Sequence, residues 1–246
     1  MQFVARTDVG KTRDVNEDYV FLNYTYPNGI TIAIVADGMG GHLAGEIASK
    51  TAVDRVCQVL EPKMILNQST DEYETLLEEA IYEANNSVYN LSLTNKEYSG
   101  MGTTIIVALI STDWLILAHV GDSRAYLSNG NNYIQLTKDH SLVNELIVNG
   151  QITEEEALVH PQRNILTRAL GTDLLVKSDI LKVNWQKDQK LILTSDGLTN
   201  YVSESKISKI LNDNSIPLEK MADYLLLEAI EAGGEDNISL IIAKNI

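Results

Sequence analysis

The segment Ile32-Ala33-Ile34-Val35-Ala36-Asp37-Gly38 decides the fold, because five consecutive apolar residues run straight into an acidic one. An apolar run of this length is typical of a strand that is buried on both faces. Three further, largely apolar runs adjoin an acid in the same way: 115–120 before Asp122, 191–195 before Asp196, and 238–242 after Asp236. Each run therefore predicts a carboxylate at one end of a buried strand.

On either side of this segment, the spacing of apolar residues changes several times between a strand-like and a helix-like pattern. The pattern predicts strands at 3–6, 19–23, 30–36, 103–110, 114–120, 123–127, 133–136, 180–183, 191–194 and 238–243, and helices at 44–60, 72–92, 204–211 and 218–231. Residues 142–172 are mixed and polar, with a helix start at Thr153 that resembles a capping box. Because strands and helices are grouped rather than alternating, we expect antiparallel sheets with helices packed outside them in layers.

The length and composition narrow the class of protein. A chain of 246 residues without a Pro- or Ser/Gly-rich linker favours a single domain over 1–246. Nineteen basic residues against 34 acidic ones give a net charge of −15, which disfavours a nucleic-acid or anionic-membrane partner. The single cysteine, Cys57, excludes a disulfide framework. No signal peptide and no apolar stretch of about 20 residues is evident, so we expect a cytoplasmic protein without membrane insertion.

The aligned acids are the candidate functional residues. Each Asp-Gly pair alone is typical of a turn, but carboxylates gathered at one edge repel one another unless cations neutralise them. Oxygen ligands without cysteine or paired histidines select Mg²⁺ or Mn²⁺ rather than zinc. Gly38, without a Cβ, leaves room for its carbonyl to approach a metal. Arg13 lies shortly before Glu17-Asp18 and is a candidate fork for phosphate oxygens, or else a solvated surface arginine.

Other motifs point to functions that the chain does not support. Gly10-Lys11-Thr12 ends like a phosphate-binding loop, but Ala5 stands where that loop requires glycine. The segment 38–43 begins like a dinucleotide fingerprint, but Leu43 replaces its third glycine. Cys57 falls within a helical pattern, and core packing is its expected role.

Six motifs, taken together and in order, resemble those of the PP2C-type (PPM) protein phosphatases. They are Arg13-Asp14-Val15-Asn16-Glu17-Asp18, Asp37-Gly38-Met39-Gly40-Gly41-His42, Gly100-Met101-Gly102-Thr103-Thr104, Val120-Gly121-Asp122-Ser123-Arg124, Ser195-Asp196-Gly197-Leu198 and Asp236-Asn237. The chain is most similar to the bacterial serine/threonine phosphatases of the family, over residues 13–237. The resemblance implies an α+β fold, a four-layer αββα sandwich of two mainly antiparallel sheets.

The resemblance also implies a centre of two Mn²⁺ or Mg²⁺ ions with a weaker third. The implied ligands are Asp37 for both core ions, the Gly38 carbonyl for one of them, Asp196 and Asp236 for the other, and Asp122 with Asp196 for the third. Glu17 and Asp18 would act through bound waters, and Arg13 would hold the substrate phosphate. A metal-bridging hydroxide would attack phosphorus in line, without a phosphoenzyme intermediate.

The chain departs from the pattern of the animal-type family members at Met39, the residue after Asp37-Gly38. Those members carry histidine at the position of Met39 and are thought to use it as general acid, whereas bacterial members do not. His42, three residues later, is the candidate acid here, and a water on the third metal is the alternative proton donor. Residues 141–172 correspond to the bacterial flap, where we expect substrate discrimination.

The leading functional hypothesis is therefore a metal-dependent protein serine/threonine phosphatase. Its expected partners are phosphorylated proteins, including a membrane-anchored bacterial Ser/Thr kinase that it opposes, and it is expected to be a monomer. One alternative is a catalytically silent, phosphoprotein-binding module, which would be expected to have lost Asp37, Asp196 or Asp236. All three are present. A second alternative is an enzyme that cleaves small phosphate esters with the same metals.

Overall fold

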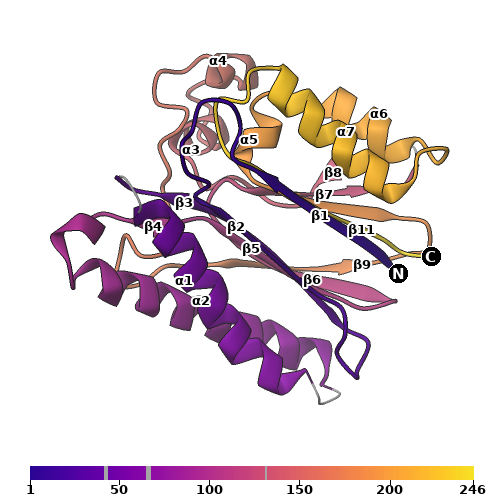
Figure 1. Ribbon diagram of the computed structural model, residues 1–246, viewed down its shortest axis with the longest axis horizontal. Helices are drawn as coiled ribbons and strands as arrows, with labels where there is room; N and C mark the ends of the chain where they lie inside the picture. Colours follow the sequence, from indigo (N-terminus) through magenta and orange to yellow (C-terminus); the bar gives the residue numbers. More distant parts are fainter. Residues whose placement is uncertain (42–43, 65–67, 131) are drawn as a thin grey trace.

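The strands of the protein form two antiparallel sheets in the computed structural model, which describes residues 1–41, 44–64, 68–130 and 132–246 (Figure 1). The β1 sheet has the order β1 (Gln2–Asp8), β11 (Ile238–Lys244), β10 (Lys190–Thr194), β7 (Arg124–Ser128) and β8 (Tyr133–Gln135). The β3 sheet has the order β2 (Asp18–Asn23), β3 (Thr31–Met39), β5 (Ile105–Ile110), β6 (Trp114–Val120) and β9 (Asp179–Asn184), with β4 (Gly102–Thr103) paired to the end of β3.

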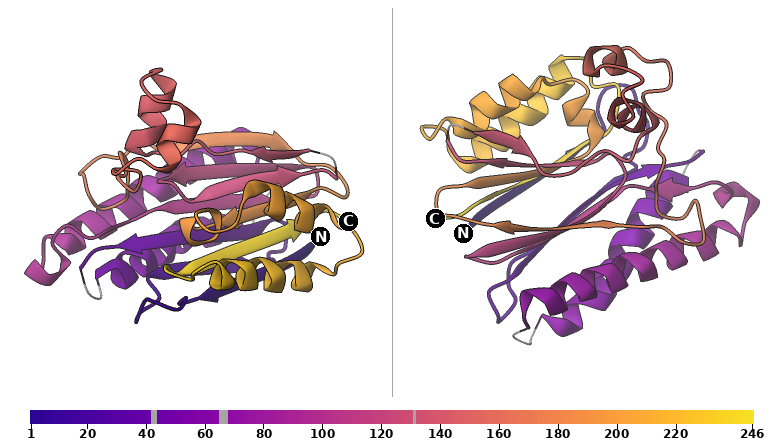
Figure 2. Two further views of the ribbon diagram at one scale, coloured as in Figure 1. Left: turned by 90° about the horizontal axis from the view of Figure 1, so that it is seen from above. Right: turned by 180° about the vertical axis from the view of Figure 1, so that it is seen from behind.

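Helices cover the outer face of each sheet, so that the molecule has four layers (Figure 1). The helices α1 (Ala44–Leu60) and α2 (Thr70–Ser92) pack on the β3 sheet, and α6 (Glu204–Asn212) and α7 (Leu218–Glu231) pack on the β1 sheet. The short helices α3 (Leu142–Val148) and α4 (Glu154–Leu158) project at one end of the sandwich (Figure 2). The predicted αββα architecture is confirmed.

Each apolar strand separates two layers of core. In β3, Ile32 and Ile34 face the helices α1 and α2, whereas Ala33 and Val35 face the other sheet. This alternation follows from the two-residue period of a strand, and burial of both faces explains why residues 32–36 are all apolar. Cys57 lies on the buried side of α1 and packs in the core, as expected. Within the described residues, no helix combines the length and apolar character needed to span a membrane.

Three local features differ from the sequence pattern. The strand β3 continues to Met39, so Asp37-Gly38 lies within a strand and does not form the turn that this dipeptide favours. The predicted strand 103–110 is broken at Thr104 into β4 and β5. Residues 142–148 and 196–199 form the short helices α3 and α5 (Asp196–Thr199), which the mixed local pattern does not reveal. The capping box at Thr153 is confirmed, with Glu156 as its partner.

Candidate metal centre

The backbone of Asp37 is fixed by two threonines of the neighbouring strands. Its amide donates to Thr104 Oγ1 at 3.0 Å, and its carbonyl accepts from the Thr104 amide at 2.8 Å and from Thr103 Oγ1 at 2.9 Å. These bonds explain the break in the predicted strand, because Thr104 turns toward Asp37 instead of continuing the ladder. The position of Asp37 is thereby set by its backbone, before any ligand binds.

Asp18 joins the two sheets. It lies opposite Asp37 in the register of β2 and β3, and its Oδ2 accepts a hydrogen bond of 2.7 Å from Ser195 Oγ. Ser195 follows β10 in the other sheet, and its hydroxyl also accepts from the Ser239 amide at 3.0 Å. The carboxylate of Asp18 is therefore buried between the sheets and held by a hydroxyl group.

Asn237 holds the segment that carries Glu17. Its Oδ1 accepts from the Glu17 amide at 2.8 Å, and its Nδ2 donates to the carbonyls of Val9 and Val15, each at 3.0 Å. The Glu17 carbonyl accepts from Ser49 Oγ at 2.6 Å. Asn237 is a residue whose positioning role the sequence does not reveal, although its motif beside Asp236 is visible there.

Two glycines allow the backbone of distant segments to meet. A Cβ on Gly197 would lie 1.9 Å from the Asn237 carbonyl oxygen, so α5 packs directly against the segment of Asp236. A Cβ on Gly38 would lie 2.1 Å from the Gly45 carbonyl oxygen. Close backbone packing therefore requires glycine at position 38, whatever its carbonyl binds.

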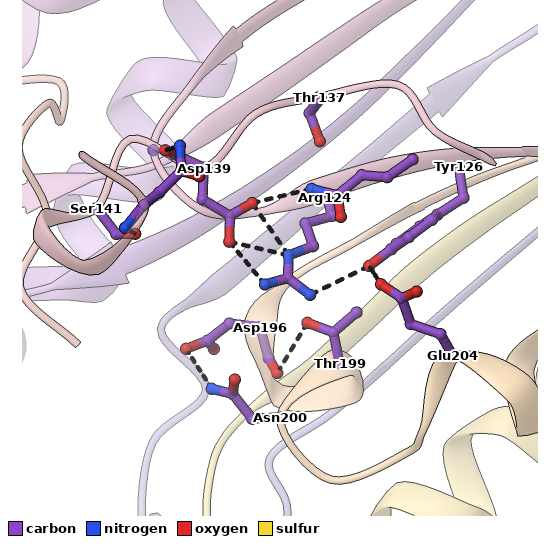
Figure 3. Close-up of polar contacts among 12 residues, drawn as sticks. Arg124, Tyr126, Thr137, Asp139, Ser141, Asp196, Thr199, Asn200 and Glu204 are labelled. Carbon is purple, nitrogen blue, oxygen red and sulfur yellow. Dashed lines mark hydrogen bonds and ion pairs between the residues drawn. The ribbon is translucent and has the colours of Figure 1, made fainter. Parts of the chain in front are cut away.

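Asp122 lies in the turn between β6 and β7, beside a partly buried ion pair. Arg124 makes a two-pronged contact with Asp139, through Nε at 3.0 Å and Nη2 at 2.7 Å, and its Nη1 donates to Tyr126 OH at 3.2 Å (Figure 3). The same view shows Asp196 nearby, with its Oδ2 accepting from Asn200 Nδ2 at 2.9 Å. Arg124 therefore supplies a fixed positive charge at the edge of the acids.

The predicted metal ligands thus come together at one end of the two sheets. We refer to the six side chains as the acidic cluster: Glu17, Asp18, Asp37, Asp122, Asp196 and Asp236. Burial and the nearby charge of Asp196 together raise the pKa of Asp18 to about 7, although the hydrogen bond from the Ser195 hydroxyl lowers it in part. Burial and the charge of Asp196 also raise the pKa of Asp122 to about 7.

The same causes act on the other buried members of the cluster. The pKa of Asp37 lies well above its ordinary value, because this carboxyl is partly buried and close to Asp18, Asp196 and Asp122. Burial also raises the pKa of Asp196 and of Glu17, and Arg13 offsets part of the rise at Glu17. Nearby positive charge would reverse these shifts, because it favours the ionised form of each carboxyl.

The donor atoms of the cluster fit hard divalent cations. Glu17 Oε1 and Asp18 Oδ1 are buried and have no hydrogen-bond partner among the described residues. In the described part of the chain, no three His, Cys, Asp or Glu side chains are grouped so that they could hold a metal ion by themselves. An open, all-oxygen arrangement is what Mg²⁺ needs, since it is usually held by one or two carboxylates and completes its shell with water.

The structure describes the predicted phosphate-binding residue, Arg13, but not the candidate general acid, His42. Arg13 lies at the rim with its side chain 45% exposed, and its Nη2 is 3.0 Å from Asp236 Oδ1. Its Nη1 is 3.8 Å from Glu17 Oε2. The arginine is therefore at the cluster, paired with two of the acids. His42 lies outside the described residues, and its role stays a prediction.

We expect the metal-free protein to become more stable as the pH is lowered from about 8 to about 6.5. Asp18 and Asp122 have a pKa of about 7 when folded, against an ordinary value of 3.8, so the stability present at low pH is lost as the pH rises through 7. Each carboxyl contributes on the order of 1 kcal/mol. His119 and His140, whose pKa burial lowers, oppose this trend only below their ordinary value of 6.5.

Thermal unfolding in chelator at several pH values measures this effect. With Mn²⁺ the trend should reverse, because metal binding requires ionised carboxylates. A metal-free Tm that increases steadily up to pH 8 would contradict the pKa assignment.

The fold is that of a known class of protein. Residues 11–226 match the family described as protein phosphatase 2C, and the chain belongs to this family of metal-dependent phosphoprotein phosphatases. It is 42% identical over 241 residues to the serine/threonine phosphatase stp of Listeria monocytogenes, covering 97% of this chain and 94% of that one.

Solved structures agree with this assignment. The crystal structure of serine/threonine phosphatase Stp1 from Staphylococcus aureus matches with a TM-score of 0.90 and 38% identity, covering 99% of this chain and 94% of that one. The catalytic domain of the serine/threonine protein phosphatase PstP, solved in complex with two manganese ions, matches with a TM-score of 0.84 and 30% identity over 99% and 97% of the two chains. Dependence on Mn²⁺ or Mg²⁺ is thus a property of the family, in keeping with the oxygen donors of the cluster.

Proposed function

We propose that the chain hydrolyses phosphoserine and phosphothreonine in proteins, at the acidic cluster. The observation that carries this proposal is the convergence of six carboxylates, from segments up to 219 residues apart, at one end of the sheets with their buried members raised in pKa. The names of the relatives, serine/threonine phosphatases, support the choice of substrate.

The proposed ligands are those that the resemblance to the PP2C-type phosphatases implies. Asp37 would contact both core ions, the Gly38 carbonyl one of them, and Asp196 and Asp236 the other. When bound, such ions polarise phosphoryl oxygens and lower the pKa of water enough for attack at neutral pH. Glu17 and Asp18, each with a buried unpaired oxygen, would accept hydrogen bonds from water at the centre.

The substrate phosphate would bind at the exposed side of the cluster. The Arg13 guanidinium is half-exposed there, and its pairing with Asp236 would weaken once cations neutralise that carboxylate. Its planar fork could then donate two hydrogen bonds to phosphate oxygens. We propose His42 as the donor of a proton to the leaving oxygen of the serine or threonine.

We further propose that Asp122, with Asp196, holds a third and weaker ion. Asp122→Ala should leave two ions bound but lower kcat by at least about tenfold, because the proposed site loses one of its two protein ligands. Titration with Mn²⁺ and turnover of a phosphothreonine peptide measure the two effects. Asp113→Ala, an exposed aspartate at the opposite end of β6, is the matched control. Finding only one ion in crystals of Asp122→Ala would show that the third site is misassigned.

Phosphate release from matched peptides tests the proposed substrate. Phosphothreonine and phosphoserine peptides should be hydrolysed in the presence of Mn²⁺, and a nucleotide and a phosphotyrosine peptide should be poorer substrates. Preferential hydrolysis of the nucleotide would favour an enzyme of small phosphate esters. Turnover of no substrate, with ions bound, would favour a silent binding module.

The cellular setting belongs to the same proposal. We propose a single catalytic domain over 1–246, acting as a monomer in the cytoplasm on phosphoproteins that include a membrane-anchored Ser/Thr kinase. The segment 141–172, which carries α3 and α4 beside the cluster, would contact the polypeptide around the phosphorylated residue. Exposed apolar side chains on it support this role: Val148, Leu158, Val159 and Ile165.

A further inference from the structure

Two buried histidines hold the turn that precedes Asp122. The rings of His119 and His140 are 2% and 4% exposed and contact each other at a tilt, with their centroids 4.4 Å apart. His119 Nε2 lies 2.8 Å from the Gly121 carbonyl oxygen and donates to it. His140 Nδ1 accepts from the Gly121 amide at 3.1 Å, and the His140 amide donates to the Gly121 carbonyl at 2.9 Å. Both backbone groups of Gly121 are therefore bonded to histidine.

The position of Gly121 leaves little freedom to the turn. Its φ of +110° belongs to the region that favours glycine, and a Cβ there would lie 2.6 Å from Thr104 Cβ. Thr104 in turn bonds the backbone of Asp37 and, through its hydroxyl, Ser123 at 2.7 Å. A shift of Gly121 would thus disturb both the direction of Asp122 and the support of Asp37.

The Nε2 side of the His140 ring faces the base of segment 141–172, where Arg168 pairs with Asp179. Because Nδ1 accepts a hydrogen bond, the proton of the neutral ring is on Nε2, which lies 3.3 Å from Asp179 Oδ2 and 3.1 Å from Arg168 Nη1. Arg168 also donates to Asp179 Oδ1 at 2.9 Å. The His140 carbonyl accepts from the Thr167 amide at 2.8 Å, which ties the returning arm of the segment to the same residue.

We propose that His140 is a positioning residue for the weaker metal site. Its Nδ1 edge holds the Gly121 amide and so directs the Asp122 carboxylate, while its Nε2 edge anchors the base of segment 141–172. The two ring nitrogens therefore have separate roles, because Nδ1 contacts the turn before Asp122 and Nε2 contacts Asp179 and Arg168. This proposal rests on the proposed function, in which Asp122 is a ligand of the third ion.

Two conservative variants separate the two edges of the ring. In His140→Asn the amide oxygen takes the place of Nδ1, so the bond to Gly121 is kept and the contact with Asp179 is lost. In His140→Gln the amide reaches the position of Nε2, and the buried Gly121 amide is left without its acceptor. Mn²⁺ binding to the full-length protein, measured by calorimetry and by paramagnetic resonance of free Mn²⁺, gives a readout that is independent of turnover.

We expect His140→Gln to weaken the most weakly bound Mn²⁺ by about ten- to a hundredfold, the usual effect of removing a partner that orients a ligand. The two tighter ions should be unaffected, kcat on the phosphothreonine peptide should fall, and KM should not change. His140→Asn should keep the affinity of the weakest ion within about threefold of the wild type. A purely structural role would instead lower Tm in both variants and affect all ions alike.

Asp122→Ala, measured in parallel, distinguishes the possible failures. If Asp122→Ala removes the weakest ion and His140→Gln does not, the proposal for His140 is wrong and that for Asp122 stands. If Asp122→Ala itself changes no ion, the assignment of Asp122 is wrong and the proposal for His140 falls with it. If His140→Gln does not fold, His140→Asn decides, because loss of the weakest ion in that variant contradicts the proposal.

Discussion

Asp37→Asn should lower kcat on a phosphothreonine peptide by about a thousandfold or more, because the side chain expected to contact both core ions loses its charge. Asparagine keeps the volume of the side chain, and the backbone bonds from Thr103 and Thr104 do not depend on it. The loss should therefore be chemical rather than structural. Steady-state kinetics at saturating Mn²⁺ measures it, with Asp113→Asn as the exposed control.

The thermal stability of Asp37→Asn without metal distinguishes loss of the metal site from damage to the fold. The Asp37 carboxyl is partly buried among other acids that raise its pKa, so replacing it by a neutral amide should raise the Tm of the metal-free protein at pH 8. An inactive variant that is also more stable without metal is the expected result. Near-native turnover of Asp37→Asn would show that Asp37 does not hold the core ions.

Removal of divalent ions should abolish activity altogether, and Mn²⁺ should restore it. Without cations the carboxylates of the cluster would repel the negatively charged phosphate group, so water is not expected to attack phosphorus there. Dialysis against chelator, followed by assay with and without added Mn²⁺, measures the effect on an aryl phosphate. The same treatment should lower Tm at pH 8, because bound ions stabilise the folded state by mass action. Turnover that persists in metal-free buffer would contradict the proposed chemistry.

The layers of the fold were predictable because they follow from local pattern. Strands buried on both faces need continuous apolar runs, such as 32–36, and the grouping of strands and helices excludes a parallel alternating sheet. Features set by contacts between distant residues were not predictable. The strand breaks at Thr104 because that residue bonds Asp37, and α3 forms in a segment without a clear period.

The acids of the site were also visible in the sequence, but the residues that hold them were less so. Aspartates at the ends of apolar runs stand out, whereas Ser195 bonds Asp18 across 177 positions and Asn237 bonds Glu17 across 220. No periodicity links residues so far apart. The sequence places His140 directly after Asp139, but the bond of its ring to the Gly121 amide depends on how distant segments pack.

The most direct measurement is anomalous diffraction from crystals grown with Mn²⁺, since the central claim concerns where the ions lie. The account predicts two strong peaks within the acidic cluster, with Asp37 next to both and with Asp196 and Asp236 next to one of them. A third, weaker peak beside Asp122 would support the proposed accessory ion. An anomalous map with no manganese among these carboxylates, from protein that is active in the same solution, would contradict the account.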